Sequence, residues 1–396
     1  MRKKVMLVLL LVALMVFSAA PVFAQDLPKP FCGQLSEEDC TILQEAQSAQ
    51  LGLSSYTSSV DATTSVAGLP GLPADELTFN WTQNSTLFLD PDITSQMMEL
   101  QSAGPEAIMK NLDDFKTTTV DFYKSLGVDA TIDFTMPDEI ASILSAQSGI
   151  EVPAEINLHV IMKDGFAYIA TEGLAFIDPS LTDMGEWLGV DLAGAVEMGL
   201  EQSMNSNDPA QQQAMMESLG LSSMLNSEQV RGLVEEYVQV ERLDDATVDN
   251  TDVAVFEHGF DFAGFLASPG FWQLIEDNLD TINAMSQTPI TAEELQQARM
   301  AVTFLGPALF QGLNFKATNS IGLEDYYTYA QTVDFNWDLS GLLQMAASTG
   351  ALPPGSPTNA SISLLVDGTN ADFDAAPAIE APADAVIIPL NGGQAQ

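Results

Sequence analysis

Positively charged residues are scarce in this chain of 396 residues. Lys and Arg together number 12, against 55 Asp and Glu, and three of the 12 (Arg2, Lys3 and Lys4) stand at the start of the sequence. Nucleic-acid phosphates are bound through Lys and Arg, and anionic membrane surfaces attract the same side chains. The acidic balance therefore excludes nucleic-acid binding and disfavours binding to an anionic bilayer.

Long apolar runs are missing beyond the N-terminus. Val5–Phe17 is an uninterrupted apolar run of 13 residues, shorter than the roughly 20 that a transmembrane helix needs. It follows the three basic residues and precedes Val22–Ala24, which puts small residues at the −3 and −1 positions of a cleavage site. This order is typical of a secretory signal peptide. We expect cleavage after Ala24, an extracytoplasmic protein (secreted or periplasmic), no stable membrane insertion, and a mature net charge of −46 from nine basic and 55 acidic residues.

Cysteine is nearly absent, with Cys32 and Cys40 the only two. In an oxidising compartment, two cysteines this close most simply form a disulfide. On the chain-entropy model, closing so short a loop would stabilise the local structure by roughly 2–3 kcal/mol. A metal site would need two further ligands, and neither histidine lies near in the sequence. We therefore predict a disulfide and no metal centre.

Residues that catalyse reactions form no recognisable set. His159 and His258 each fall in a predicted strand and lack the paired spacing of a metal site. No GxSxG nucleophile elbow is present, and the carboxylates are too numerous for any acid pair to stand out. Asp367–Asp372 offers oxygen ligands for calcium, but its spacing does not match an EF-hand loop, and a solvated acidic turn is the simpler interpretation. We expect neither enzymatic activity nor a cofactor.

Helical patterns alternate with strand patterns in blocks. Ser36 can cap a helix over Glu37–Gln50. The next segment, Leu51–Ala74, is rich in Ser, Thr and Gly and contains two prolines, which is typical of a linker. Period-two alternation begins at Leu77. Further helices are expected at Ala193–Met204, from Asp208–Pro209, from Ser268–Pro269 to Ile282, and from Thr291, which forms a capping box with Glu294.

The clearest local structure is a hairpin over Glu155–Thr171. Asp164–Gly165 is a two-residue turn that requires positive φ, and it pairs Met162 with Ala167 and Val160 with Ile169. Other strands are expected at Trp187–Leu192, Tyr237–Glu241, Val253–His258, Asp325–Trp337 and Ser361–Asp367. Blocks of hairpins and helices predict an α+β fold, with antiparallel strands and helices packed on one face.

Two strand segments have long apolar faces. One lies on the Glu155–Thr171 hairpin and the other on the strand at Asp325–Trp337. We expect both to look inward, toward helices whose stripes run from Phe271 to Ile282 and from Leu295 to Leu309. If these helices leave a gap, the space is an apolar pocket. The candidate pocket residues are Leu158, Val160, Met162, Ile169, Tyr327, Tyr329, Val333, Phe335, Trp337, Leu295 and Val302.

Several segments resemble the extracytoplasmic lipoprotein-carrier superfamily, which includes the lipoprotein-localisation carrier and the mycobacterial cell-wall lipoproteins. They are the hairpin "INLHVIMKDGFAYIA", the short "GEWLGVDL" before a helix, the strand–turn–strand "YVQVERLDDATVDNTDVAVFEHGFDFAGFL", and the Pro-containing "AIEAPADA" near the end. The resemblance covers about Leu77 to Leu390 and implies a curved antiparallel half-barrel with helices on its concave face around an apolar cavity. It supplies no catalytic residues, and this chain lacks the lipobox cysteine of many relatives.

The sequence therefore predicts four regions and a binding function. The regions are a signal peptide (1–24), a disulfide-containing segment with a linker (25–75), a half-barrel binding domain (76–390) and a tail (391–396). The favoured function is non-enzymatic binding or transport of a hydrophobic small molecule or lipid. A structural or adhesive extracellular protein with a filled core is the first alternative, and a secreted hydrolase is the least favoured.

Overall fold

The computed structural model describes residues 30–389, apart from 103–107, 109, 206–227, 280–281, 284–289, 311 and 354. The expected signal peptide, the tail at 391–396 and the helix expected from Asp208–Pro209 lie outside the described residues. Within the described part of the chain, no helix is both long enough and apolar enough to cross a membrane.

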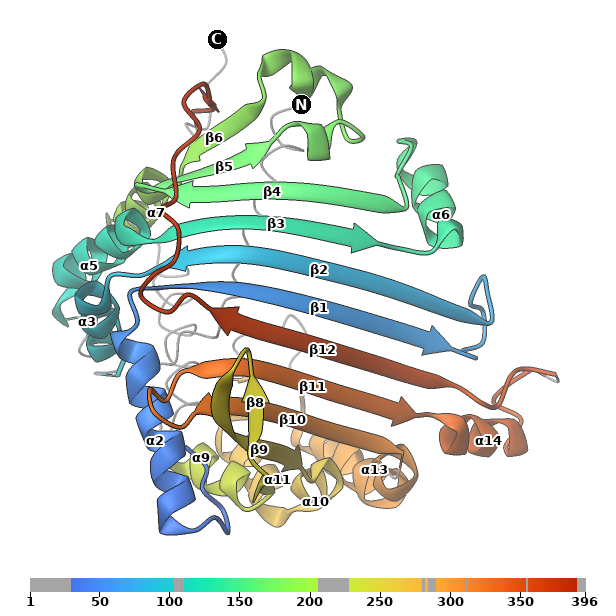
Figure 1. Ribbon diagram of the computed structural model, residues 1–396. Coiled ribbons are helices and arrows are strands. Elements are labelled where there is room, and N and C mark those ends of the chain that lie inside the picture. The colour runs from blue at the N-terminus through green and yellow to red at the C-terminus, as the bar shows by residue number, and fades with distance from the viewer. Residues whose placement is uncertain are drawn as a thin grey trace.

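One large open sheet organises the described chain (Figure 1). Its strands follow the order β13-β6-β5-β4-β3-β2-β1-β12-β11-β10-β9-β7, with β8 paired to β9. All pairs are antiparallel except β13 with β6. The bounds are β1 Ser55–Ala67, β2 Glu76–Phe88, β3 Gly127–Thr135, β4 Glu155–Lys163, β5 Phe166–Ala170, β6 Trp187–Asp191, β7 Val238–Arg242, β8 Ala246–Val248, β9 Thr251–Phe260, β10 Leu313–Gly322, β11 Thr328–Asp338, β12 Ser361–Ala371 and β13 Val386–Ile387.

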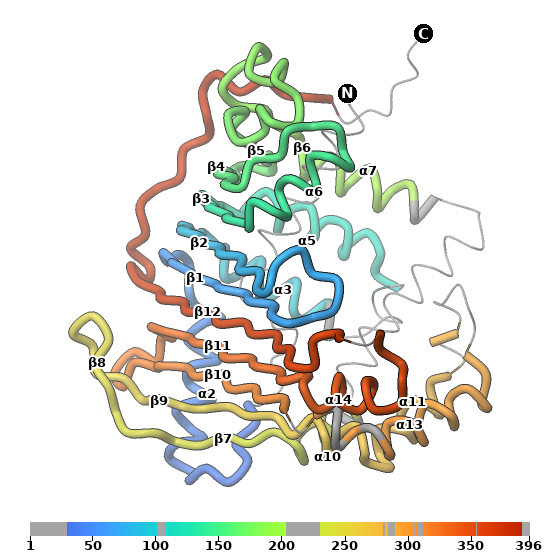
Figure 2. Tube along the Cα trace, turned by 90° about the vertical axis from the view of Figure 1, so that its right-hand side faces the viewer, coloured from blue at the N-terminus to red at the C-terminus, as the bar shows by residue number. Residues whose placement is uncertain are grey.

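Helices lie on one side of this sheet, which confirms the predicted α+β class. Seen nearly along the strands, the sheet forms a shallow arc, with α3, α5, α6, α7, α11, α13 and α14 on its hollow side (Figure 2). The bounds are α2 Glu37–Gly52, α3 Pro91–Ser102, α5 Leu112–Ser125, α6 Asp138–Ser148, α7 Leu192–Asn205, α9 Glu228–Glu235, α10 Phe262–Ala267, α11 Pro269–Asp277, α13 Ala292–Phe310 and α14 Ser340–Ser348, with 3-10 turns at Glu172–Leu174 and Pro179–Met184.

Strand register gives the sheet one apolar and one polar face. Val128 lies opposite Met162, and Phe335 lies opposite Leu364, so apolar side chains of neighbouring strands point the same way. The alternate residues are largely Thr, Ser, Asn and Asp, as in the Asn80, Thr82, Asn84 series of β2. Because side chains alternate with period two, one register slip would expose the whole apolar set. The apolar face, here called the concave face, is the one that α2, α5 and the 3-10 turns cover.

The segment expected to be a linker is instead a central strand. Residues 55–67 form β1, which pairs along its whole length with β2 and also with β12. Tyr56, Val60 and Ala62 point to one face of β1, and most of its Ser and Thr side chains point to the other face. This pattern suits a strand with one polar face. The expectation of a linker over Leu51–Ala74 is therefore wrong.

The C-terminal segment covers part of the opposite face. After β12 the chain crosses the front of β1 to β5 toward β6 (Figure 1). Ile379 is buried against Ile161 and Tyr168, with Phe88 and Trp187 beside them. This packing explains why the β4–β5 hairpin is apolar on both of its faces.

Candidate ligand-binding face

The upper part of the concave face is a closed core. Val160, Met162 and Ile169 are buried, and Leu158 packs beside them. Leu174 and Leu181 from the 3-10 turns complete this core with Val128, Ala130, Ile132 and Leu188. The predicted pocket residues Leu158, Val160, Met162 and Ile169 therefore share one face, as expected. They contribute to a filled interior rather than to a free surface.

The middle of the same face is less covered. Val333, Phe335 and Trp337 on β11 are only half-buried, although they point to the helix side. Their partners are equally apolar and equally half-buried: Val366, Leu364 and Ile362 on β12, and Ala317, Phe315 and Leu313 on β10. The register thus assembles a continuous apolar surface across β10, β11 and β12.

Tyr327 and Tyr329 lie away from this surface, at the end of the sheet near α2. The Tyr327 ring stacks on Phe373 with centroids 4.5 Å apart, and its hydroxyl donates to Asp374. Tyr329 donates to Asp325 at 2.6 Å. Burial, followed by these carboxylates, raises the pKa of both phenols. Through these hydrogen bonds, the two tyrosines fix the backbone at the start of β11 to Asp325 and Asp374.

Helix α13 contributes the two helical candidates. Thr291 and Glu294 form the predicted capping box: the Thr291 amide donates to the Glu294 carboxylate at 2.8 Å, and the Glu294 amide donates to the Thr291 hydroxyl at 3.2 Å. Leu295 is buried and Val302 is half-buried. Phe304 is 81% exposed on the same helix. The side chains of Leu305 and Leu309, which end the predicted stripe, lie outside what the structure describes.

Polar groups sit within the concave face, which the sequence reasoning missed. On β2 the side chains that share the face of Leu77 and Phe79 include Trp81, Gln83 and Ser85. Gln83 is 4% exposed and Ser85 7%. Tyr56, on β1, is 5% exposed, and burial raises its pKa. The available signal was the interruption of β2's apolar alternation at Gln83 and Ser85.

The two histidines have structural surroundings. His159 lies on the polar face, where its Nε2 is 2.7 Å from Asp129 Oδ1 and its ring meets Trp187 edge-on. His258 lies on the concave face at its far edge, between Val240 and Ala317, and burial lowers its pKa. Among the described residues, the two histidines lie on opposite faces of the sheet, and neither has the other beside it.

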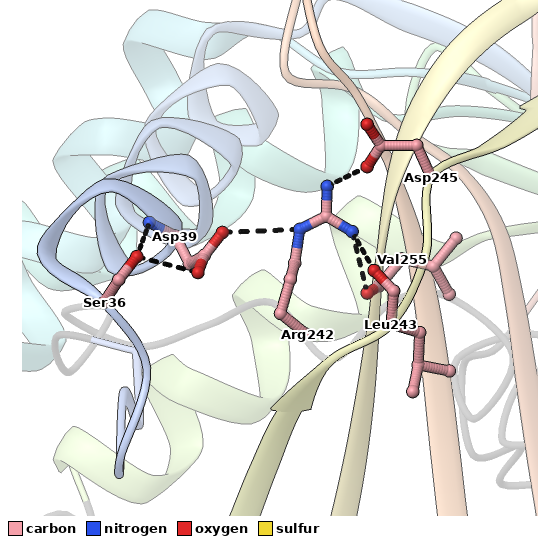
Figure 3. Close-up of polar contacts among 6 residues, drawn as sticks. All are labelled: Ser36, Asp39, Arg242, Leu243, Asp245 and Val255. Carbon is pink, nitrogen blue, oxygen red and sulfur yellow. Dashed lines mark hydrogen bonds and ion pairs between the residues drawn. The ribbon is translucent and has the colours of Figure 1, made fainter.

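At the other end of the concave face, α2 is fixed to β7 and β9. Arg242 pairs with Asp39 at 3.4 Å and with Asp245, and its guanidinium donates to the carbonyls of Leu243 and Val255 (Figure 3). A cleft of about 860 Å³ lies between residues 33–39 and strands β7, β9 and β10. Charged groups line it, including Glu257 and Lys316, so it does not suit an apolar ligand.

No candidate metal site emerges from the described residues, where no three His, Cys, Asp or Glu side chains come together. The segment Asp367–Asp372, considered for calcium, is mostly the end of β12 rather than a turn. Asp367 accepts from Thr332 on the polar face, whereas Asn370 donates to the Thr328 carbonyl. Strand alternation therefore separates the oxygens that calcium would need together.

Comparison with solved structures gives matches at very low identity and low TM-score. No protein-family model matches the chain, and no curated protein sequence is similar to it. LprF from Mycobacterium bovis is 12% identical, over 88% of this chain and 98% of its own, with a TM-score of 0.28. The Mycobacterium tuberculosis lipoprotein LppX is 8% identical, over 87% and 100%, with a TM-score of 0.29. A LolA superfamily protein from Nitrosomonas europaea is 7% identical, over 86% and 94%, with a TM-score of 0.16. These matches say nothing of a ligand.

Proposed function

We propose that this protein is a non-enzymatic, extracytoplasmic carrier that binds a hydrophobic ligand, such as a lipid, against the concave face of its sheet. The observation that supports the proposal most is the half-buried apolar surface of β10, β11 and β12 on the helix side. Acyl chains laid on this surface would gain roughly 0.8 kcal/mol for each buried CH2. The signal peptide predicted at 1–24 and the Cys32–Cys40 disulfide support the extracytoplasmic location.

The test is whether the mature protein, residues 25–396, carries or binds lipid. We expect mass spectrometry of an organic extract to find copurified lipid, and a fluorescent fatty acyl probe to bind at micromolar concentration. Phe335→Ala should weaken probe binding by roughly tenfold, because it removes part of the apolar surface. Asp334→Ala is the matched control, since Asp334 is exposed on the opposite face of the same strand.

The alternative, a structural or adhesive protein, predicts the opposite result for lipid binding. A protein with a filled interior would yield no lipid on extraction and would bind no probe. Phe335→Ala would then lower the free energy of unfolding, as the loss of a buried side chain does in any protein core. It would have no effect on ligand binding, because no ligand would bind. That combination of results would contradict the carrier and favour a structural or adhesive role.

A further inference from the structure

From the buried polar atoms of the concave face, we infer that the ligand has an uncharged polar part, and that Tyr56, Trp81 and Gln83 hold it by hydrogen bonds. This inference rests on the proposed carrier function and adds the chemical class of the ligand. It concerns a site in the middle of the sheet, on the adjacent strands β1 and β2.

The observation is a set of unpaired hydrogen-bonding atoms. The Tyr56 hydroxyl, the Trp81 indole nitrogen and the Gln83 carbonyl oxygen are all buried and have no hydrogen-bond partner among the described residues. Leaving a buried polar atom without a partner is destabilising, so each such atom in a folded protein calls for an explanation. The Trp81 and Gln83 atoms lie two residues apart on one strand and point to a shared occupant, which reaches Tyr56 further along the same face.

Register places these groups along one track. Trp81 and Gln83 are alternate residues of β2 and therefore point to the same face. Tyr56 lies opposite Leu87, further along the same face of β1. Gln83 has Val60 and Ile132 as its cross-strand neighbours, and both are apolar. The polar atoms therefore stand in an apolar setting that continues into the half-buried surface of β12 and β11.

The chemistry of the three groups defines what they recognise. An indole N–H only donates, the amide carbonyl of Gln83 only accepts, and a phenol does both. A ligand that satisfies them must offer a carbonyl or ether oxygen together with a hydroxyl or amide hydrogen. Acyl esters with a free hydroxyl group, such as partial acylglycerols, have this combination.

Charge on the ligand is disfavoured at this site. On the concave face, strands β1 to β6 and β10 to β12 present no Lys, Arg, Asp or Glu side chain. Arg242, which is on the same face, lies at the far edge and is already paired with Asp39 and Asp245. A carboxylate or phosphate placed against Gln83 would lose its hydration without gaining a counter-ion. The ligand class is therefore a neutral amphiphile.

The experiment compares a neutral amphiphile, an anionic amphiphile and a hydrocarbon, in mature protein stripped of lipid. Dioleoylglycerol, oleate and hexadecane would each compete with the fluorescent acyl probe. We expect dioleoylglycerol to bind best. Gln83→Met removes the side-chain amide and Tyr56→Phe the hydroxyl, both at nearly constant volume, whereas Trp81→Phe removes the indole N–H together with part of the ring. Each should weaken dioleoylglycerol binding by about tenfold. Hexadecane binding should stay within about twofold, since it makes no hydrogen bond.

Two further measurements separate binding from folding. Gln239→Met makes the same chemical change at an exposed site on the polar face of β7, and it should leave all three affinities unchanged. Ligand-free Gln83→Met should unfold at the same temperature as the wild type or higher, because it removes a polar atom that lacks a partner. A large loss of stability in that variant would show that Gln83 is already paired, and would overturn the inference.

The binding outcomes distinguish the inference from the carrier function itself. If hexadecane and dioleoylglycerol bind equally and the three variants change neither, buried water satisfies the polar atoms, so the inference fails while the carrier function stands. Tighter binding of oleate would overturn the neutral class. If no probe binds the wild type at all, the proposed carrier function is wrong, and the inference that rests on it is wrong as well.

Discussion

Gly165 closes the β4–β5 hairpin with a φ of +83°, after Asp164 with a φ of +53°. A Cβ at Gly165 would also lie 2.8 Å from the Ala193 Cβ, well inside contact distance. Gly165→Val therefore meets both backbone strain and a clash. We expect it to lower the free energy of unfolding by about 1–3 kcal/mol, measured by urea denaturation.

Gly232→Ala is the matched control for that substitution. Gly232 lies inside α9 and does not have a positive φ, and no described side chain lies within 4 Å of where an alanine Cβ would be. Alanine there should stabilise the protein by up to about 1 kcal/mol. A Gly165→Val protein as stable as the wild type would show that the turn does not have the conformation described.

Single residues also show where sequence reasoning succeeds. The Asp164–Gly165 dipeptide specifies its own turn, so the pairs Met162–Ala167 and Val160–Ile169 followed from it and are present. Gln83 has no such local signature. Its burial depends on the strands β1 and β3 that flank β2 and on the helices that cover this face. This tertiary packing cannot be predicted from the alternation of apolar and polar residues along one strand.

At the scale of secondary structure, helix α2, which is 16 residues long, is held at its N-terminal end by several contacts. The Ser36 hydroxyl accepts from the Asp39 amide at 3.1 Å, as its position before the helix predicted. The predicted disulfide is present, with Cys32 and Cys40 Cα atoms 5.3 Å apart. On the other side of the helix start, Asp39 pairs with Arg242 (Figure 3). The disulfide therefore fixes the N-terminal segment where it meets the concave face.

Replacing both Cys32 and Cys40 by Ser tests the contribution of this crosslink. We expect the free energy of unfolding to fall by roughly 2–3 kcal/mol, because the unfolded chain regains the freedom of the closed loop. Mass spectrometry of the unreduced wild type should first show a mature chain two hydrogens lighter than the reduced one. Two free thiols in that sample would contradict the crosslink, and reductant should leave the double variant's stability unchanged.

Strands were predictable from the sequence where apolar and polar residues alternate strongly. They were not predictable where few residues of the strand are apolar. β11 alternates aromatic and polar residues over most of its length and was recognised, with its start three residues further on than expected. β1 consists largely of Ser and Thr, and its few apolar residues did not outweigh that composition. It becomes a strand because β2 and β12 pair with both of its edges, so long-range pairing overrides local preference.

At the scale of the whole molecule, acidic charge is in excess. Its few cations are used locally, as in the pairs Lys116–Glu201 at 2.9 Å and Lys316–Glu257 at 2.7 Å. With 55 Asp and Glu for 12 Lys and Arg, most of the carboxylates therefore have no cation to pair with. Net charge far from zero favours solubility and opposes compactness through self-repulsion.

One such repulsion is built into the centre of the polar face. Asp61 on β1 lies directly opposite Asp367 on β12, and like charges in cross-strand pairs are destabilising. Each carboxylate accepts one hydrogen bond from a threonine, Thr82 for Asp61 and Thr332 for Asp367. An asparagine at position 61 would keep the acceptor for Thr82 and would offer a donor to Asp367.

Asp61→Asn should therefore stabilise the protein, by about 0.2–1 kcal/mol at low ionic strength. The gain should shrink in 1 M NaCl, where the Debye length falls to about 3 Å, while the wild-type melting temperature rises as salt screens the overall repulsion. Asp92→Asn is the control: it removes the same unit of charge but takes it from the first turn of α3, where the helix dipole favours an acid, so it should not stabilise. Thermal unfolding of the three proteins across a salt series measures both effects. Equal gains from the two substitutions would mean that net charge alone matters, whereas a gain confined to Asp61→Asn locates the repulsion between β1 and β12.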